Sequence, residues 1–311
     1  MTSDDFEEAL GKKLSLFILP FLVSIGLVGN LLTFYIFGRD AFAKTSISFH
    51  LRALSLFDAL AVVTGLFMAL DASGLTVTAH SSFTCKLINY WTFVPAACSA
   101  HFEAFISFER MLSIVYPNRF HLISNNNRLF NWSLLAGILL FNSLTYLPIP
   151  LTYETNSSEN ECHASSQSYD DYISWFDMFN STLVPFTLMF VFTTLIIHRL
   201  FESRNRVMPS AKKTTTATTT SGSLTVTRGI SGVEVYQARK KRDYQFALTS
   251  IAICFKFFLL NIGSVIIFVL DIHGMIPERL SVLLSNVFEI LFYVEFSFKF
   301  FIHLAINSRF R

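Results

Sequence analysis

Seven apolar runs, each long enough to cross a lipid bilayer, constrain the fold of this chain more than any other feature. A membrane-spanning helix needs about 20 consecutive, mostly apolar residues. The runs cover residues 14–37, 47–70, 86–114, 129–151, 174–199, 244–270 and 280–304. Only 15% of the residues are charged, against about 25% in a typical soluble domain. The sequence therefore predicts an all-α membrane protein built as a seven-transmembrane helix bundle.

The charges in the loops predict how these helices are oriented. Lys and Arg gather in the loops that face the cytoplasm. The segment 199–242 contains ten of them, whereas the loop between the fourth and fifth runs carries acids. These acids are Glu154, Glu159, Glu161, Asp170 and Asp171. We therefore expect the N-terminus outside and the C-terminus inside, in a multi-pass protein of the plasma membrane.

The runs also divide the chain into parts. Residues 1–13 are predicted to be an extracellular N-terminus, without the basic and small-residue pattern of a cleavable signal peptide. Residues 14–304 form the transmembrane domain. It is interrupted at about 203–240 by a Thr/Ser-rich stretch, predicted to be a mobile cytoplasmic loop because it has too few apolar residues to pack. Residues 305–311 are predicted to be a short cytoplasmic amphipathic end.

The third run carries specific residues at a fixed spacing. Arg110 lies 25 positions after Cys85, which corresponds to roughly 37 Å of helix. The cysteine and the Glu109-Arg110 pair therefore fall near opposite faces of the membrane. This spacing resembles the third span of rhodopsin-like (class A) G-protein-coupled receptors. Further marks of that family occur in order at Gly29-Asn30, Asp58, Ser99, Trp132, Pro185 and Phe310.

The resemblance covers about residues 14 to 311, and its narrower likeness is to invertebrate FMRFamide-type neuropeptide receptors and their nematode chemoreceptor relatives. It implies an extracellular ligand, with a peptide favoured over a small molecule, and a heterotrimeric G protein as partner. It implies no enzymatic activity, no cofactor or metal, and no nucleic acid. It also implies a disulfide between Cys85 and Cys162. Asn156 begins a glycosylation sequon in the same acidic loop.

Several positions depart from the family pattern. Met111 follows Glu109-Arg110 where the family has Tyr. The sixth run has Asn261 and Gly263 in place of Trp and Pro, and the seventh has Lys299 to His303 in place of Asn-Pro-x-x-Tyr. The prolines that kink these helices in the family are missing, and Gly263 is a candidate to replace one of them.

Charges inside the apolar runs are costly enough to suggest a function. Asp58 and Ser99 match the sodium site of the family, but Lys299 stands where the family has Asn. We predict that Lys299 replaces the ion and pairs with Asp58, and that Glu295, one turn earlier, lies nearby. The alternative is that Lys299 extends its ammonium group to the cytoplasmic interface.

Two further pairs of charged residues can be interpreted either as ion pairs within the bundle or as separate charges. Glu103 and Lys256 are predicted to join the third and sixth spans, unless each faces water or another partner. Arg110 is predicted to hold Glu109 in the resting state, unless the two form only an interfacial charge pair. The residues assigned to activation and G-protein coupling are Asp58, Glu109, Arg110, Lys299 and His303.

The outer half of the bundle offers a candidate ligand site. Thr92 occupies the position where amine receptors carry Asp, which argues against a monoamine ligand. With Trp91, Asn261 and Glu289 it forms the predicted site. Aromatic side chains, a buried carboxylate and an acidic lid suit a cationic, aromatic ligand such as an amidated peptide ending in Arg-Phe. Alternatively, the aromatic side chains face lipid.

Other functions remain open at this point. A chemosensory receptor for small molecules is the first alternative, and a receptor-like protein that binds without signalling is the second. A transporter would explain charges within the membrane, but the sequence has no internal repeat with paired broken spans. An intramembrane enzyme is disfavoured, because the sequence has no His-Glu-x-x-His motif and no convincing nucleophile–base pairing.

Overall fold

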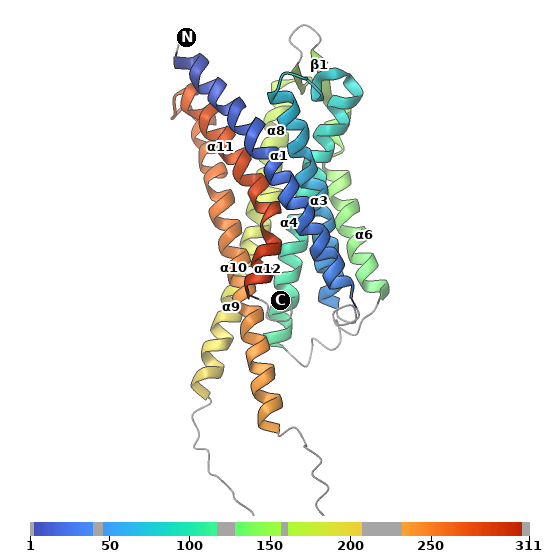
Figure 1. The fold of residues 1–311 in the computed structure, drawn as a ribbon, viewed down its shortest axis with the longest axis vertical. Helices are drawn as coiled ribbons and strands as arrows, with labels where there is room; N and C mark the ends of the chain where they lie inside the picture. The colour runs from blue at the N-terminus through green and yellow to red at the C-terminus, as the bar shows by residue number, and fades with distance from the viewer. Residues whose placement is uncertain (1–2, 40–45, 117–127, 157–160, 207–231, 307–311) are drawn as a thin grey trace, which may run out of the picture.

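The helices form one elongated bundle with their axes along a common direction (Figure 1). A computed structural model describes residues 3–39, 46–116, 128–156, 161–206 and 232–306. The first helix begins at the end that carries a short β-hairpin, and the last one finishes toward the opposite end (Figure 1). This is the all-α seven-helix membrane bundle that the sequence predicts.

Each predicted span corresponds to one or more helical segments. The first three are α1 (Ser3–Gly38), α3 (Ser46–Ala72) and α4 (Ser82–Val115). The fourth span consists of α6 (Arg128–Thr145) and α7 (Pro148–Thr152). The fifth consists of α8 (Gln167–Asp177), the π-helix η2 (Met178–Leu183) and α9 (Val184–Arg206). The last two are α10 (Gly232–Ile272), and α11 (Glu278–Ser297) with α12 (Lys299–Ile306). A 3₁₀ turn, η1 (Thr78–His80), and the antiparallel strands β1 (Tyr153–Asn156) and β2 (Glu161–Ala164) join them at one end.

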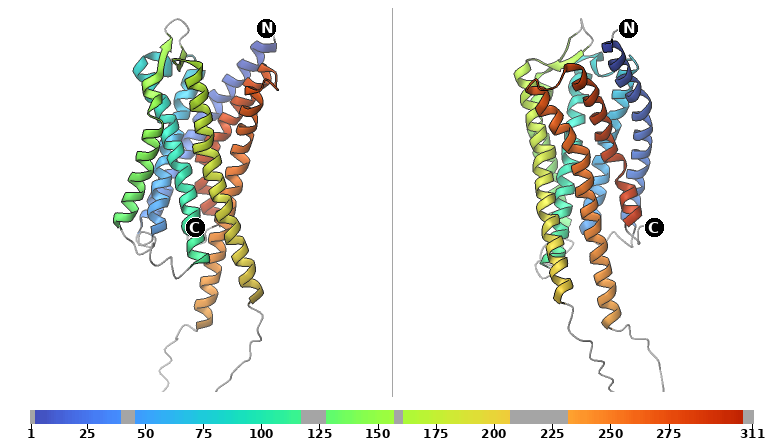
Figure 2. Two further views of the ribbon diagram at one scale, coloured as in Figure 1. Left: turned by 180° about the vertical axis from the view of Figure 1, so that it is seen from behind. Right: turned by 90° about the vertical axis from the view of Figure 1, so that its left-hand side faces the viewer.

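The ends of several helices differ from the expected spans. Residues 3–13, predicted as an N-terminal extension, belong to α1. The predicted loop at about 203–240 is shorter, because α9 continues to Arg206 and α10 starts at Gly232. Residues 232–242 include Gln, Ala, Arg and Lys, which favour helix. At the end of the bundle opposite the β-hairpin, α9 and α10 both extend past the neighbouring helices (Figure 2). Residues 207–231 and 307–311, which include Phe310, lie outside the described residues.

Polar residues are distributed unevenly among the spans. Five described helical stretches are long and apolar enough to cross a membrane by composition alone: 13–38, 47–72, 128–152, 168–202 and 248–272. The third span, α4, and the seventh, α11–α12, are not among them. These two spans contain Glu103, Glu289, Glu295 and Lys299. These two spans therefore supply much of the polar interior.

The seventh span is interrupted although it has no proline. Phe298 has φ −100° and ψ 1°, outside the helical region, and separates α11 from α12. On the α11 side of this break, the Asn30 amide of α1 donates a hydrogen bond to the Phe296 carbonyl (3.1 Å), and the Ser297 hydroxyl donates to the Leu22 carbonyl (3.0 Å). The break therefore lies where polar groups tie the seventh span to the first.

Gly263 fits a close helix contact. It lies within α10, which is one unbroken helix from Gly232 to Ile272. A Cβ atom at this position would lie 2.0 Å from Cε1 of Phe288 on α11. The missing side chain thus lets Phe288 fill the space beside α10, which accounts for the glycine without a kink.

Gly263→Ala is expected to destabilise the protein. The added methyl group collides with the Phe288 ring, and overpacking of this kind costs about 1–3 kcal/mol. Thermal unfolding of the purified protein measures the loss, and Phe288→Ala in the same background should recover part of it. Gly137→Ala is the matched control, because a Cβ at Gly137 meets nothing within 4 Å. Equal melting temperatures for the two alanine variants would contradict the contact.

Candidate ligand cavity and buried charge network

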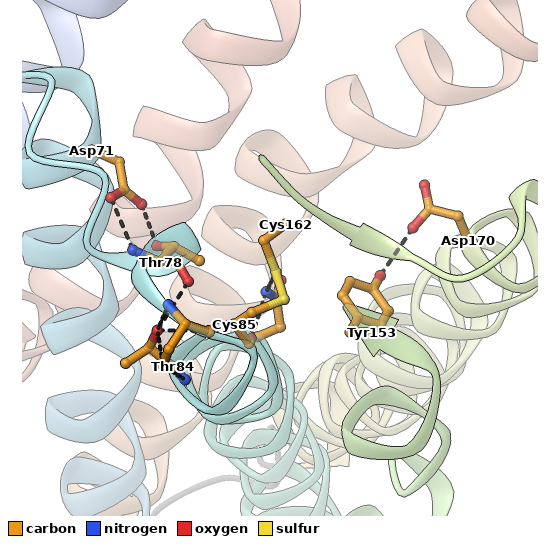
Figure 3. The surroundings of a disulfide bond; sticks show 9 residues. Asp71, Thr78, Thr84, Cys85, Tyr153, Cys162 and Asp170 are labelled. Carbon is orange, nitrogen blue, oxygen red and sulfur yellow. Dashed lines mark hydrogen bonds between the residues drawn. A yellow bond between two sulfur atoms is a disulfide. The ribbon is translucent and has the colours of Figure 1, made fainter. Parts of the chain in front are cut away.

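The disulfide predicted between Cys85 and Cys162 is present and joins the first turn of α4 to strand β2 (Figure 3). Beside it, the Tyr153 hydroxyl of β1 donates a hydrogen bond to Asp170 of α8 (2.9 Å). Burial and the Asp170 carboxylate raise the pKa of Tyr153 above its usual value, so the phenol remains a donor at physiological pH. The hairpin is thereby attached to both α4 and α8.

Asp71, a further acid at this end, has a structural role. Its carboxylate accepts hydrogen bonds from the backbone N–H of Thr78 (3.0 Å) and from the Thr78 hydroxyl (Figure 3). Asp71 thus stabilises the turn between α3 and α4. It is not among the residues that line the cavity described next.

A cavity of about 350 Å³ lies between α4, the α8–η2–α9 span, α10 and α11. Its acidic lining residues are Asp177, Asp271, Glu289 and Glu295. Its aromatic ones are Phe257, Phe268, Phe288, Phe292 and Phe296. No Lys or Arg occurs among the described lining residues. The cavity is therefore lined by aromatic side chains and by carboxyl groups, without a basic side chain in its described lining.

The structure divides the predicted ligand residues into two pairs. Glu289 and Asn261 line the cavity, whereas Trp91 and Thr92 do not. The Trp91 indole donates to the Leu60 carbonyl of α3 (3.0 Å), and its side chain is 39% exposed. The Thr92 hydroxyl donates back to the carbonyl of Ile88 in its own helix (2.9 Å). Trp91 and Thr92 therefore lie outside the cavity lining, because spacing does not fix which way a side chain turns.

Asp177 is a cavity residue that the sequence analysis missed. The hydroxyl of Tyr146, in the turn between α6 and α7, donates to its carboxylate (2.6 Å). The Asn180 amide of η2 in turn donates to Tyr146 (3.2 Å) and to Asn142 (3.1 Å). The only sequence signal was an isolated acid at the start of an apolar run.

Below the cavity, five ionisable side chains form a network. Lys299 Nζ lies 2.7 Å from Asp58 Oδ1 and 2.8 Å from Glu103 Oε1. Lys256 Nζ lies 3.3 Å from Glu103 Oε1 and 3.5 Å from Glu295 Oε1. The contacts join α3, α4, α10, α11 and α12, and they include the predicted pairs Asp58–Lys299 and Glu103–Lys256. Lys299 is only 4% exposed, so the alternative in which it reaches the interface is wrong.

Ser99, Asn261 and Glu295 belong to both the cavity and the network. The Ser99 hydroxyl donates to Asp58, and Lys299 Nζ donates to the Ser99 oxygen (2.9 Å). The Asn261 amide donates to Glu295. All three residues line the cavity. The charge network therefore borders the cavity through Glu295, Ser99 and Asn261.

The Glu109-Arg110 pair is arranged differently from the prediction. Glu109 Oε2 lies 2.9 Å from Nδ1 of His50 on α3, and both side chains are buried. In the described part of the chain, the partner of Glu109 is therefore His50 and not Arg110. His50 was not among the predicted residues, although a histidine within an apolar run is a visible signal.

Arg110 and His303 meet at a second, much smaller cavity. It has a volume of about 20 Å³, close to that of one water molecule. Glu103, Ser107, Thr249 and Ser250 complete its polar lining. Three of the five residues predicted to act in activation, Arg110, Lys299 and His303, therefore contact Glu103 or line a cavity with it. The fourth, Asp58, shares the Lys299 ammonium group with Glu103.

Comparison with known proteins identifies the family. Residues 29–298 match the family described as "7 transmembrane receptor (rhodopsin family)". The chain belongs to the rhodopsin family of seven-transmembrane receptors. It is accordingly a multi-pass protein of the plasma membrane and not an enzyme.

Curated relatives of this receptor are similar at low identity. Cysteinyl leukotriene receptor 1 of Mus musculus is 24% identical over 198 residues, which cover 61% of this chain and 55% of the relative. The Homo sapiens protein is 23% identical over 198 residues, which cover 61% of this chain and 58% of the relative. The Sus scrofa protein is 23% identical over 220 residues, which cover 68% of this chain and 63% of the relative. The matches thus span little more than half the length of these relatives. They lend no support to the narrower likeness to invertebrate neuropeptide or nematode receptors.

The receptor is expected to be insensitive to sodium. The Lys299 ammonium group already contacts Asp58 and Ser99, the two residues that match the sodium site of the family. Replacing sodium chloride by choline chloride at equal ionic strength should therefore leave the melting temperature of the purified receptor unchanged. A sodium-specific rise that disappears in Asp58→Asn would contradict this expectation.

Proposed function

We propose that this receptor binds a positively charged ligand in the cavity at its disulfide end and activates a heterotrimeric G protein at the opposite end. The observation that carries the proposal is the cavity of about 350 Å³ with four carboxylates and no Lys or Arg in its described lining. Such a site favours cations and repels anions. Its volume is at the lower end of the range for small-molecule sites.

Glu289 is the best candidate for the residue that pairs with the ligand. It is half-buried and lines the cavity, and no hydrogen bond or ion pair with another described residue occupies its carboxylate. A guanidinium group can bind both oxygens of such a carboxylate. The phenylalanine side chains around it can pack against an aromatic ring or a cation. An amidated peptide ending in Arg-Phe combines these groups, and its amide avoids a terminal carboxylate.

The orientation in the membrane is part of the proposal. The disulfide end is taken as extracellular, because disulfides persist in oxidising compartments and the basic segment 199–242 favours the cytoplasm. Asn156 ends β1 at this face and is the proposed glycosylation site. Two other sequons begin at Asn131 and Asn180, which are buried in the bundle and therefore unsuitable.

A lipid ligand of the leukotriene type is the second candidate, because the curated relatives are named for cysteinyl leukotrienes. A leukotriene carries a carboxylate, which would face the acids of the cavity. A chemosensory ligand and a receptor that binds without signalling are the remaining alternatives, and the same experiment separates all of them.

The test is a concentration–response measurement of G-protein activation in cells. The ligands are peptides ending in Arg-Phe-amide, the same peptides with neutral citrulline in place of Arg, cysteinyl leukotrienes and small odorants. We expect a response to the Arg peptide only, weakened about tenfold or more by Glu289→Gln, since a charge-assisted pair is lost. Glu289→Asp retains the charge and should lose less.

Other outcomes would move the receptor to another class. A leukotriene response that is unchanged in Glu289→Gln would overturn the cationic-ligand proposal. An odorant response would favour the chemosensory alternative. Peptide binding without G-protein activation, at confirmed surface expression, would show a receptor that does not signal.

A further inference from the structure

The charge network under the cavity contains one carboxylate more than it has ammonium groups. Asp58, Glu103 and Glu295 face Lys256 and Lys299. Two buried carboxylate oxygens, Oδ2 of Asp58 and Oε2 of Glu103, have no hydrogen-bond partner among the described residues. Because an uncompensated charge inside a bundle is costly, this network favours one further cation.

Glu295 is the carboxylate that is least neutralised. Asp58 and Glu103 each have the Lys299 ammonium group within 2.8 Å. The nearest ammonium nitrogen to a carboxylate oxygen of Glu295 is that of Lys256 at 3.5 Å, and Lys256 lies closer to Glu103, at 3.3 Å. Lys256 is thus shared, and its contact with Glu103 is the shorter one.

Glu295 can also be reached from the cavity. It lines the cavity together with Asn261, whereas Asp58, Glu103 and both lysines do not. Glu289 lies six residues earlier on α11 and lines the same cavity. Six residues correspond to about 9 Å along the helix axis. One small ligand can therefore place separate positive groups against the two carboxylates.

We propose that Glu295 is a second ligand-recognition residue, and that the ligand is dibasic, with a guanidinium group at Glu289 and an ammonium group at Glu295. This inference rests on the proposed function and specifies its ligand. The unpaired carboxylate of Glu289 offers both oxygens to a planar guanidinium. At Glu295 the ammonium group of the ligand takes the place of the Lys256 ammonium group. Lys256 keeps its contact with Glu103. Arg-Phe-amide carries both cations when its N-terminus is free.

The matched probes are Arg-Phe-amide and N-acetyl-Arg-Phe-amide, which differ by one positive charge. Their apparent affinities are measured from the rise in melting temperature of the purified full-length receptor with ligand concentration. We expect the wild type to prefer the free amine by about tenfold or more, as the loss of a buried charge pair predicts. Glu295→Gln should abolish this preference and leave the affinity for the acetylated probe nearly unchanged.

Two variants serve as controls for the charge of the cavity. Glu289→Gln should weaken both probes by a similar factor and keep the preference. Asp271→Asn removes an exposed carboxylate from the same lining and should also keep it. If Glu295→Gln fails to fold, Glu295→Asp retains the charge with a shorter reach and should reduce the preference.

The failures of the two proposals are distinguishable. Equal affinity of the wild type for both probes, with binding that still depends on Glu289, overturns the second recognition residue alone. A preference that persists in Glu295→Gln does the same. Absence of binding by either probe, or binding that is unaffected by Glu289→Gln, overturns the cationic-ligand proposal and this inference with it.

Discussion

Lys299→Met is expected to destabilise the receptor more than removal of any single carboxylate of the network. The substitution keeps a flexible, unbranched side chain that is one heavy atom shorter, but it leaves Asp58, Glu103 and Glu295 with only the Lys256 ammonium group. Removing one partner of a buried ion pair costs about 3–5 kcal/mol, because the other charge stays buried and unpaired. In a protein of this size we expect the melting temperature to fall on the order of 10 °C.

The matched comparison is Asp58→Asn. This change removes one of three carboxylates and leaves two carboxylates with two ammonium groups, so the loss should be much smaller. Surface expression and thermal unfolding in detergent measure both variants. If Lys299→Met is as stable as the wild type, the Lys299 ammonium group is not needed to neutralise the interior.

The exchange of Glu103 and Lys256 is the second change with a large expected effect. For an isolated pair, Glu103→Lys combined with Lys256→Glu would restore the contact. Here Glu103 Oε1 also lies 2.8 Å from Lys299 Nζ. The exchange therefore places two buried ammonium groups side by side, where their repulsion is only weakly screened. We expect surface expression to be lost in Glu103→Lys and not to be rescued by the exchange.

Glu103→Gln is the control for this experiment. It leaves Lys299 with Asp58 and Lys256 with Glu295, in equal numbers of opposite charges. We therefore expect near-normal surface expression for this variant. Full rescue by the exchange would show that Glu103 pairs with Lys256 alone, contrary to the shared contact.

Much of the fold and of the charge network followed from the sequence, for physical reasons. A run of about 20 apolar residues has few alternatives to a spanning helix, because its backbone must be hydrogen-bonded internally. A charge inside such a run must find a partner, and few were available. This limited choice is why the pairs Asp58–Lys299 and Glu103–Lys256 could be predicted.

Features that depend on how each helix is rotated could not be predicted in the same way. Glu109 and Arg110 are adjacent in sequence, but neighbouring residues on a helix point about 100° apart. The side chain of Glu109 thus reaches His50 on α3. Trp91 failed as a cavity residue for a similar reason, because it turns toward the Leu60 carbonyl. The break at Phe298 has no proline to announce it.

The central claim is that Lys299 neutralises the carboxylates beneath the ligand cavity, and a double-mutant cycle tests it most directly. Thermal unfolding is measured for the wild type, Asp58→Asn, Lys299→Met and the double variant. The double variant keeps the wild-type balance of charge, so it should be more stable than Lys299→Met, with a coupling free energy of about 1–3 kcal/mol. Losses that simply add in the double variant would contradict the claim.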